Sequence, residues 1–327
     1  MLNLPERKDF LLTASAFLAL SASTNTLAQS YPTKPVRLFV GFSAGAAPDV
    51  IARLMIPALS QMFGQSWIVE NRGGAGGSLA TENVAKAPAD GYTLLMMAAA
   101  DTMQPALRSK LPYDLERDFA PITLLASGMS VMVMHPSVPV KNVKELIALA
   151  RANPGKLNYG SSGIGSSSHL MGELFNQMAG VKIAHVPYKG STESATATAA
   201  GEIEISFPSV ASVAPLLDAG KLRAIAVTSS RRAVSFPNLP TIDEAGLPGY
   251  DRRSWFGVIA PTGLSRDIIA QLHTALSKVV SGPDMVAALN KQGLEPQTNT
   301  PEQFSTFIRG EIAQNAKLIK LAGAKSE

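Results

Sequence analysis

Short apolar runs alternate along the chain with segments whose apolar residues recur every three or four positions. Val36–Val40 is apolar apart from Arg37 and predicts a buried strand, and helical spacing follows from Asp49 until Gly64. This alternation is typical of an α/β protein with mostly parallel sheets. Further strands are expected at Trp67–Glu70, Tyr92–Met97, Leu157–Tyr159, Ile183–Val186, Ile203–Phe207 and Leu222–Val227.

The same unit of strand, small-residue loop and helix begins again in the second half of the chain. The strand Leu157–Tyr159, the loop Gly160–Ser167 and the helix Ser168–Ala179 repeat the order seen first around the loop Gly41–Pro48. We therefore predict two α/β lobes joined by two crossing strands, near Val131–Met134 and near Ser254–Ile259. The expected division is 29–133 for the first part of lobe 1, 134–253 for lobe 2 and 254–327 for the return to lobe 1, including helices at Arg266–Val280 and Pro301–Ala322.

The first 28 residues have the parts of a secretory signal peptide. Arg7 and Lys8 precede the apolar run Phe10–Leu20, and small or polar residues lead to a cleavage position after Ala28. The run is shorter than the roughly 20 apolar residues that cross a bilayer. An exported, periplasmic protein is therefore predicted, with a buried N-terminal helix as the alternative.

Length and charge narrow the class of protein. Removing 28 of the 327 residues leaves 299, which suits two lobes better than one core. The net charge of +4 is spread along the chain, without the basic block and interleaved aromatics of a nucleic-acid-binding protein. No cysteine is present to carry a lipid anchor, and a soluble monomer is expected.

The segment Gly41–Gly45 fits the G-x-S-x-G pattern of a hydrolase nucleophile elbow, with Ser43 as the nucleophile. Its position argues against catalysis, because it follows the first mature strand and no upstream loop supplies an oxyanion hole. A second interpretation suits the loop better. Small residues let backbone N–H groups approach a ligand, and the following helix directs the positive end of its dipole toward it. Asp49 is expected to cap that helix.

The loop Gly160–Ser167 offers hydroxyls and free amides before another helix, and an ordinary helix-capping turn is the alternative. A dinucleotide fingerprint fails because Ser168 stands at the third glycine position, and no Walker A motif occurs. The four histidines are scattered, and no cysteine pair exists. We predict no cofactor, no metal site and no catalytic residue.

Many short motifs in order resemble the receptors of the tripartite tricarboxylate transporter family, also called Bug proteins. The resemblance covers nearly the whole mature chain. It rests on Tyr31–Pro35, Glu70–Arg72, Ala75–Gly77, Asp90–Leu95, Leu111–Asp114, Asp118–Pro121, Asn158–Ser161, Gly163–Ser166 with His169–Leu170, Pro187–Gly190, Pro240–Thr241, Glu244–Pro248 and Trp255–Gly257.

The resemblance implies a type II periplasmic-binding fold whose lobes close on a carboxylate such as a dicarboxylate, an amino acid or an aromatic acid. It also implies membrane transporter subunits as partners; an orphan or signalling receptor of the same fold is the alternative. In the family, two small-residue loops hold the ligand through backbone amides and bridging waters. The ligand-binding residues expected here are Ser43, Ala44, Gly45, Ala46, Ala47, Asp101, Ser161, Ser162, Gly163, Gly165, Ser166, Ser167, His169 and Arg253.

Three positions depart from the family pattern. Ala46 adds a methyl group that is expected to narrow the site or to block a positive φ. Asp101 is expected to repel a second carboxylate and to favour a ligand with an amino, ring N–H or hydroxyl donor. Arg253 either grips a distal carboxylate or faces solvent.

Overall fold

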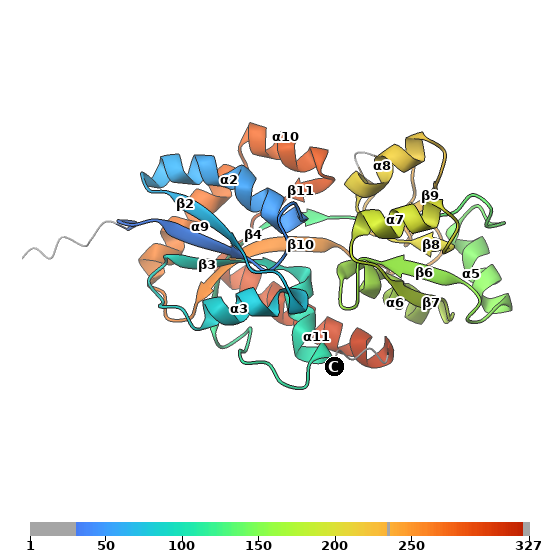
Figure 1. Ribbon diagram of the computed structural model, residues 1–327, viewed down its shortest axis with the longest axis horizontal. Helices are drawn as coiled ribbons and strands as arrows, with labels where there is room; N and C mark the ends of the chain where they lie inside the picture. The colour runs from blue at the N-terminus through green and yellow to red at the C-terminus, as the bar shows by residue number, and fades with distance from the viewer. Residues whose placement is uncertain (1–30, 234–235, 323–327) are drawn as a thin grey trace, which may run out of the picture.

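The computed structural model describes residues 31–233 and 236–322, which form two sheets joined at the middle of the molecule (Figure 1). The first sheet has the order β11-β4-β10-β3-β1-β2. Its strands β1, β2 and β3 run parallel, whereas β10 and β11 pair antiparallel with their neighbours. The bounds are β1 (Val36–Val40), β2 (Trp67–Asn71), β3 (Thr93–Ala98), β4 (Phe119–Gly128), β10 (Ser254–Pro261) and β11 (Leu294–Pro296).

Helices cover both faces of this sheet, and together they form the first lobe. Leu38 and Phe39, neighbours on β1, belong to different core clusters because successive side chains of a strand point to opposite faces. On the Leu38 side lie α2 (Ala47–Phe63), α9 (Arg266–Val280) and α10 (Pro283–Lys291); on the Phe39 side lie α3 (Ser78–Ala85) and α11 (Pro301–Ala322).

The second lobe is built on a five-stranded sheet of order β7-β6-β8-β5-β9. Strands β6, β7 and β8 are parallel, and β5 runs antiparallel to β8 and β9. Its elements are β5 (Val131–Met134), α5 (Val143–Ala152), β6 (Asn158–Ser161), α6 (Ser167–Ala179), β7 (Ala184–Pro187), α7 (Ser191–Ala199), β8 (Ile205–Ser206), α8 (Val210–Asp218) and β9 (Arg223–Val227).

Local sequence sets several helix ends. Gly64 ends α2 at φ 63°, a left-handed conformation that glycine adopts without a Cβ penalty. Asn142 caps α5 by accepting the N–H of Glu145, whose carboxylate accepts the N–H of Lys141. Ser265 caps α9 in the same way, through the N–H of Ile268. These caps satisfy N–H groups that have no partner within the helix.

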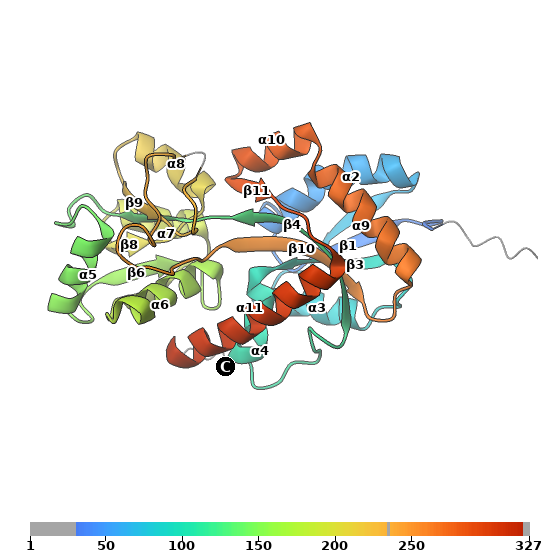
Figure 2. The same cartoon turned by 180° about the vertical axis from the view of Figure 1, so that it is seen from behind.

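The chain passes between the lobes twice, after β4 and before β10, and α11 runs obliquely below β10 from the first lobe toward α6 (Figure 2). A small apolar cluster joins the lobes there, with Met103 and Leu107 from the first, Leu170 from the second and Ile319 from α11. The lobes are therefore connected by packing as well as by the crossing segments.

The predicted fold class, two α/β lobes joined by crossing strands, is confirmed. The helices Arg266–Val280 and Pro301–Ala322 have the predicted bounds. One assignment differs: residues 131–133 were placed in the first lobe, but β5 pairs with β8 and β9 in the second sheet. The signal peptide predicted for residues 1–28 lies outside the described residues.

Candidate ligand-binding site

Helix N-termini follow the carboxyl ends of parallel strands in both lobes. In the first lobe, β1 leads to α2, β2 to the 3₁₀ turn η1 (Ala75–Gly77) and α3, and β3 to the 3₁₀ turn η2 (Ala99–Met103) and the short helix α4 (Gln104–Leu107). In the second, β6, β7 and β8 lead to α6, α7 and α8. Ligands of open α/β sheets bind at such edges, where unpaired N–H groups and helix dipoles favour an anion.

The first loop, 41–47, carries exposed small residues up to the first residue of α2. Ser43, Ala44 and Gly45 are exposed, and a turn is closed by the N–H of Ala46 donating to the carbonyl of Ser43 at 3.1 Å. Gly45 has φ 83°, a conformation that suits glycine. Ala46 has φ −69°, so its methyl group causes no backbone strain and the predicted block of a positive φ is absent.

A buried carboxylate and a half-buried amide hold this loop from behind. The carboxylate of Asp49, 2 % exposed, accepts the N–H of Gly45 at 2.8 Å and the Nε–H of Arg53 at 3.0 Å. Asn71, at the end of β2, donates its side-chain amide to Asp49 and to the carbonyl of Phe42. The prediction of Asp49 as the helix cap is corrected: Ala46 is the N-cap, and Asp49 is the third helical residue, reaching back into the loop.

The first loop packs against the glycine-rich turn before α3. A Cβ on Gly41 would lie 2.7 Å from the Cα of Gly77, so the two backbones touch. Behind this turn, the carboxyl group of Asp101 accepts the hydroxyl of Thr81 at 3.1 Å and the N–H of Ala98 at 2.8 Å. The three segments after β1, β2 and β3 thus form one assembly.

Asp101 is 1 % exposed, and burial raises the pKa of its carboxyl to about 7 although its two donors oppose this shift. A Cβ on Gly77 would lie 2.6 Å from Asp101 Oδ1. The turn of Gly77 therefore lies against the carboxylate that the sequence predicted to select the ligand. In this structure Asp101 supports the turn.

The second loop, 161–167, is a compact set of turns at the start of α6. Gly163 and Gly165 have φ values of 120° and 73°. Ser166 is the N-cap of α6 and accepts the N–H of His169 at 3.2 Å, while the N–H of Ser162 donates to Ser168 Oγ at 2.9 Å. Apart from that of His169, the N–H groups of the first helical turn precede the first intrahelical bond, so α6 offers them as donors beside this loop.

The second loop faces the other lobe. A Cβ on Gly165 would lie 2.5 Å from Leu107 Cδ1 of α4. A series of contacts leads from α4 back to the first loop. A Cβ on Gly76 would meet the side chain of Gln104 in α4, and the neighbouring Gly77 touches Gly41 of the loop. Both predicted loops therefore border the junction between the lobes.

His169 lies beneath the second loop rather than on its surface. The ring is 4 % exposed and stacks on His185 of β7 with centroids 4.0 Å apart. Its Nδ1 accepts the N–H of Gly165 at 3.1 Å, and His185 Nε2 lies 2.7 Å from Ser161 Oγ. Sequence reasoning named His169 but missed His185, which β6–β7 pairing brings beside Ser161.

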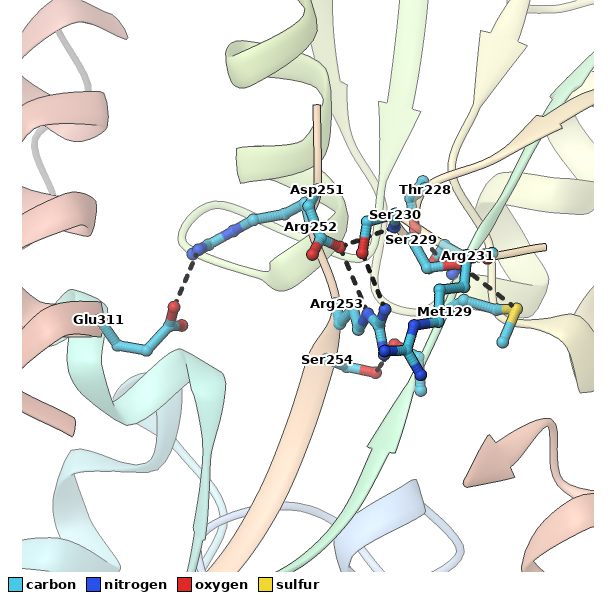
Figure 3. A network of polar contacts seen from close by, with 12 residues as sticks. Met129, Thr228, Ser229, Ser230, Arg231, Asp251, Arg252, Arg253, Ser254 and Glu311 are labelled. Atoms are coloured by element: carbon cyan, nitrogen blue, oxygen red, sulfur yellow. Dashed lines mark hydrogen bonds and ion pairs between the residues drawn. The ribbon is translucent and has the colours of Figure 1, made fainter. Parts of the chain in front are cut away.

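Arg253 lies at the second crossing and is half-buried. Its guanidinium donates to Asp251 Oδ1 at 3.3 Å and to Ser230 Oγ at 3.1 Å (Figure 3). It therefore has partners within the crossing segment, and ligand binding by Arg253 stays a prediction. The adjacent Arg252 points away toward α11, where it pairs with Glu311.

A group of hydroxyls at the starts of α7 and α8 was not predicted. Ser191 Oγ accepts the N–H of Ser209 at 2.9 Å, and Ser209 Oγ lies 2.8 Å from Ser212 Oγ. The relevant signal is the small-residue start of each helix, but only the fold brings residues 191 and 209 together.

The geometry does not assemble a serine hydrolase triad around Ser43. His135 bonds Ser137, His273 bonds the carbonyl of Asn299, and His169 and His185 stack on each other. Within residues 31–233 and 236–322, no cluster of three or more potential metal ligands occurs, and no helix is long and apolar enough to span a membrane.

Two α/β lobes, two crossing segments and amide-rich loops at the junction define a type II periplasmic-binding fold. The comparisons identify its family: the model of the tripartite tricarboxylate transporter family receptor matches residues 51–324. The chain belongs to this family of solute-binding receptors, also called Bug proteins, as the sequence predicted.

Relatives and solved structures agree with this assignment. The chain is 36 % identical over 309 residues to the UPF0065 protein of the tcbD–tcbE intergenic region of Pseudomonas sp. (strain P51), covering 93 % of this chain and 92 % of that protein. It is 33 % identical over 318 residues to Protein BugT of Bordetella pertussis, covering 97 % and 96 %.

Two similar structures contain an organic acid. Rpa4515 of R. palustris, solved with adipate, has a TM-score of 0.80 and 38 % identity, covering 90 % of this chain and 98 % of that one. MatC of Rhodopseudomonas palustris, solved with bound malate, has a TM-score of 0.77 and 29 % identity, covering 88 % and 100 %.

Proposed function

We propose that this protein is a non-catalytic periplasmic receptor that captures a small carboxylate between its lobes and delivers it to membrane transporter subunits. The observation that carries the proposal is the convergence of two amide-rich loops, 41–47 and 161–167, on the junction between the lobes. Helix N-termini and backbone N–H groups hold a carboxylate without a side-chain cation.

The character of the loops favours an organic acid as the ligand. Neither loop contains a lysine or an arginine, so binding depends on amides, hydroxyls and bridging water. The two similar structures hold adipate and malate, both dicarboxylates. Dicarboxylates are therefore the first candidates, and amino acids and aromatic acids complete the proposed range.

Capture requires both lobes, so the proposed site includes the predicted residues of each. In the first loop these are Ser43 to Ala47, which are mostly exposed. In the second they are the backbone and hydroxyl groups of Ser161 to Ser167. Asp101 and His169 act from beneath their loops, and Arg253 is proposed only as a distal contact.

A screen by thermal shift tests this function, followed by calorimetry on each acid that raises the melting temperature. The panel contains adipate, malate, amino acids and aromatic acids. At least one acid is expected to stabilise the protein, because a ligand that binds only the folded state adds RT ln(1 + [L]/Kd) to its stability. Failure of the whole panel at millimolar concentration would contradict a carboxylate receptor.

A bulky side chain in the first loop is expected to weaken this binding. Ala44 is exposed, so Ala44→Trp fills the space ahead of α2 with little cost to the fold. We expect at least about a tenfold loss of affinity, equivalent to about 1.4 kcal/mol. Ala270→Trp, on an exposed position of α9, is the control and should bind normally. Equal affinity in both variants would remove the first loop from the site.

A further inference from the structure

Two stacked histidines lie directly under the second loop. His169 comes from the first turn of α6 and His185 from β7, and their ring planes are only 18° from parallel. Tyr159 of β6 also stacks on His185, with centroids 5.0 Å apart. Three rings from three elements thus pack together beneath residues 161–167.

Each histidine bonds a different part of the loop. His169 Nδ1 accepts the N–H of Gly165, whose positive φ depends on the turn being held in place. Ser161 Oγ lies 2.7 Å from His185 Nε2 and 3.1 Å from both the carbonyl and the N–H of Gly163. The loop is therefore fixed at both of its glycines from below.

The bond to Gly165 requires an unprotonated Nδ1, since a protonated nitrogen has no lone pair to accept with. The surroundings keep the ring neutral: burial lowers the pKa of His169 to about 4, and burial together with His169 lowers the pKa of His185 to about 3. The N-terminal dipole of α6 also disfavours a cation in its first turn.

We propose that His169, stacked on His185, is a positioning residue that locks the second loop in its binding conformation, and that protonation of His169 unlocks it. The proposal builds on the function above, because the loop it fixes is half of the proposed site. His169 acts through Gly165 and does not touch the ligand.

The charged and ionisable groups on the surrounding elements are few. On α6, Glu173 accepts the hydroxyl of Tyr159 at 2.6 Å, and burial raises the pKa of this carboxyl. After β7 come Tyr188 and Lys189, and the N–H of Lys189 donates to Glu193 of α7. Tyr250 donates its hydroxyl to the carbonyl of Met171 in α6, and Arg151 donates to the carbonyl of Ala179 at the end of that helix. Farther from the histidines lie Arg108 after α4, bonded to Gln104, and on α11 Glu311, paired with Arg252, and the exposed Lys317 and Lys320.

The direction of the pH effect follows from the lowered pKa. Freed from the locked loop, His169 returns toward its ordinary value of about 6.5, so the unlocked state binds protons more readily. Locking is complete above about pH 6.5 and weakens as the pH falls toward about 4. Between these values, the population of the unlocked state grows by up to about tenfold per pH unit.

Hydrogen exchange at the amide of Gly165, measured by NMR without ligand, tests the proposal. The protection factor, which corrects for the intrinsic pH dependence of exchange, is compared between about pH 7.5 and about pH 5. We expect it to fall at least about tenfold in the wild type. An unchanged protection factor over this range would overturn the proposal.

Two variants distinguish the hydrogen bond that His169 accepts from the volume that its side chain fills. His169→Asn retains an acceptor near the position of Nδ1 and does not titrate, so protection should stay high and lose its pH dependence. His169→Leu retains volume but no acceptor, so protection should be low throughout. His135→Asn, in the same lobe but bonded to Ser137, is the control and should match the wild type. Wild-type behaviour of His169→Asn would contradict the role of His169 even if the leucine variant fails to fold.

Adipate supplies a separate measurement of the proposed function. If adipate binds the wild type at about pH 7.5, His169→Leu should weaken it at least about tenfold and His169→Asn should restore most of the affinity. Absence of adipate binding to the wild type, with the exchange results as expected, would leave the positioning role supported and count only against adipate as the ligand.

Discussion

Asp101 is a buried carboxyl group beside the turn that supports the first loop, and its titration makes the stability of the folded protein depend on pH. It lies against the turn of Gly77, which in turn touches Gly41 of the loop. Because burial raises the pKa of Asp101 to about 7, the folded protein binds a proton more tightly there than the unfolded chain does. The contribution of this group to stability is therefore present at acidic pH and lost as the pH rises through about 4 to 7.

Asp101→Asn should remove this dependence. The free energy of unfolding of the wild type, relative to the variant, is expected to decline by up to about 4 kcal/mol between about pH 4 and about pH 8, since each unit of the raised pKa corresponds to about 1.4 kcal/mol. Chemical denaturation of both proteins at several pH values measures the difference, which cancels the opposite effect of the histidines. A difference that stays constant with pH would show that Asp101 does not titrate in this range.

Arg252 is a buried cation in the second crossing segment, and it connects this segment to α11. Its Nη1 lies 3.4 Å from Glu311 Oε1, and its Nη2 donates to Asn315, which itself donates to Thr102 in η2. Glu311 also accepts the indole N–H of Trp255 at 2.9 Å. A single polar network thus joins the crossing segment, α11 and the turn after β3.

Removing Arg252 from this network should lower the free energy of unfolding more than removing Arg253, whose ion pair is more exposed. Arg252→Met is expected to lower the free energy of unfolding by about 3 kcal/mol, because it leaves the mostly covered Glu311 without its cation. Arg253→Met removes a more exposed pair with Asp251 and should cost less than about 1 kcal/mol. Denaturant unfolding compares the two; similar losses would contradict the structural role given to Arg252.

At the scale of elements, the strand–loop–helix units were predictable because their apolar periods are strong. The helix α9 has the predicted bounds, since Ser265 caps it and its apolar residues recur at helical spacing. The helix α7, with the sequence STESATATA, has no apolar period and was missed, because its burial depends on packing against α8. The long strand β4 was missed for a related reason: its pairing with β10 spans more than a hundred residues of sequence.

The two loops proposed to bind the ligand stand out in the sequence by their small residues, but the side chains that support them do not. Asp49 was expected at the cap, whereas it reaches back to Gly45 with help from Asn71 at the end of another strand. His185 reaches Ser161 only through the pairing of β6 with β7. Such contacts join residues that no local pattern relates, so they follow from tertiary structure alone.

At the scale of the whole molecule, the lobes are joined by crossing segments (Figure 2) and by the small apolar cluster that includes Ile319 of α11. The proposed loops border the same junction from either side. A ligand that contacts both lobes at once binds a closed arrangement better than an open one, and it shifts the population accordingly. We thus propose that the protein captures its ligand by closing the two lobes around it.

Small-angle X-ray scattering tests this central claim most directly. The radius of gyration is measured without ligand and with a saturating acid whose binding calorimetry has established, and Ala44→Trp with the same acid is the control. The wild type should become more compact on binding, and the variant should not change. An unchanged radius of gyration in the saturated wild type would contradict capture by lobe closure.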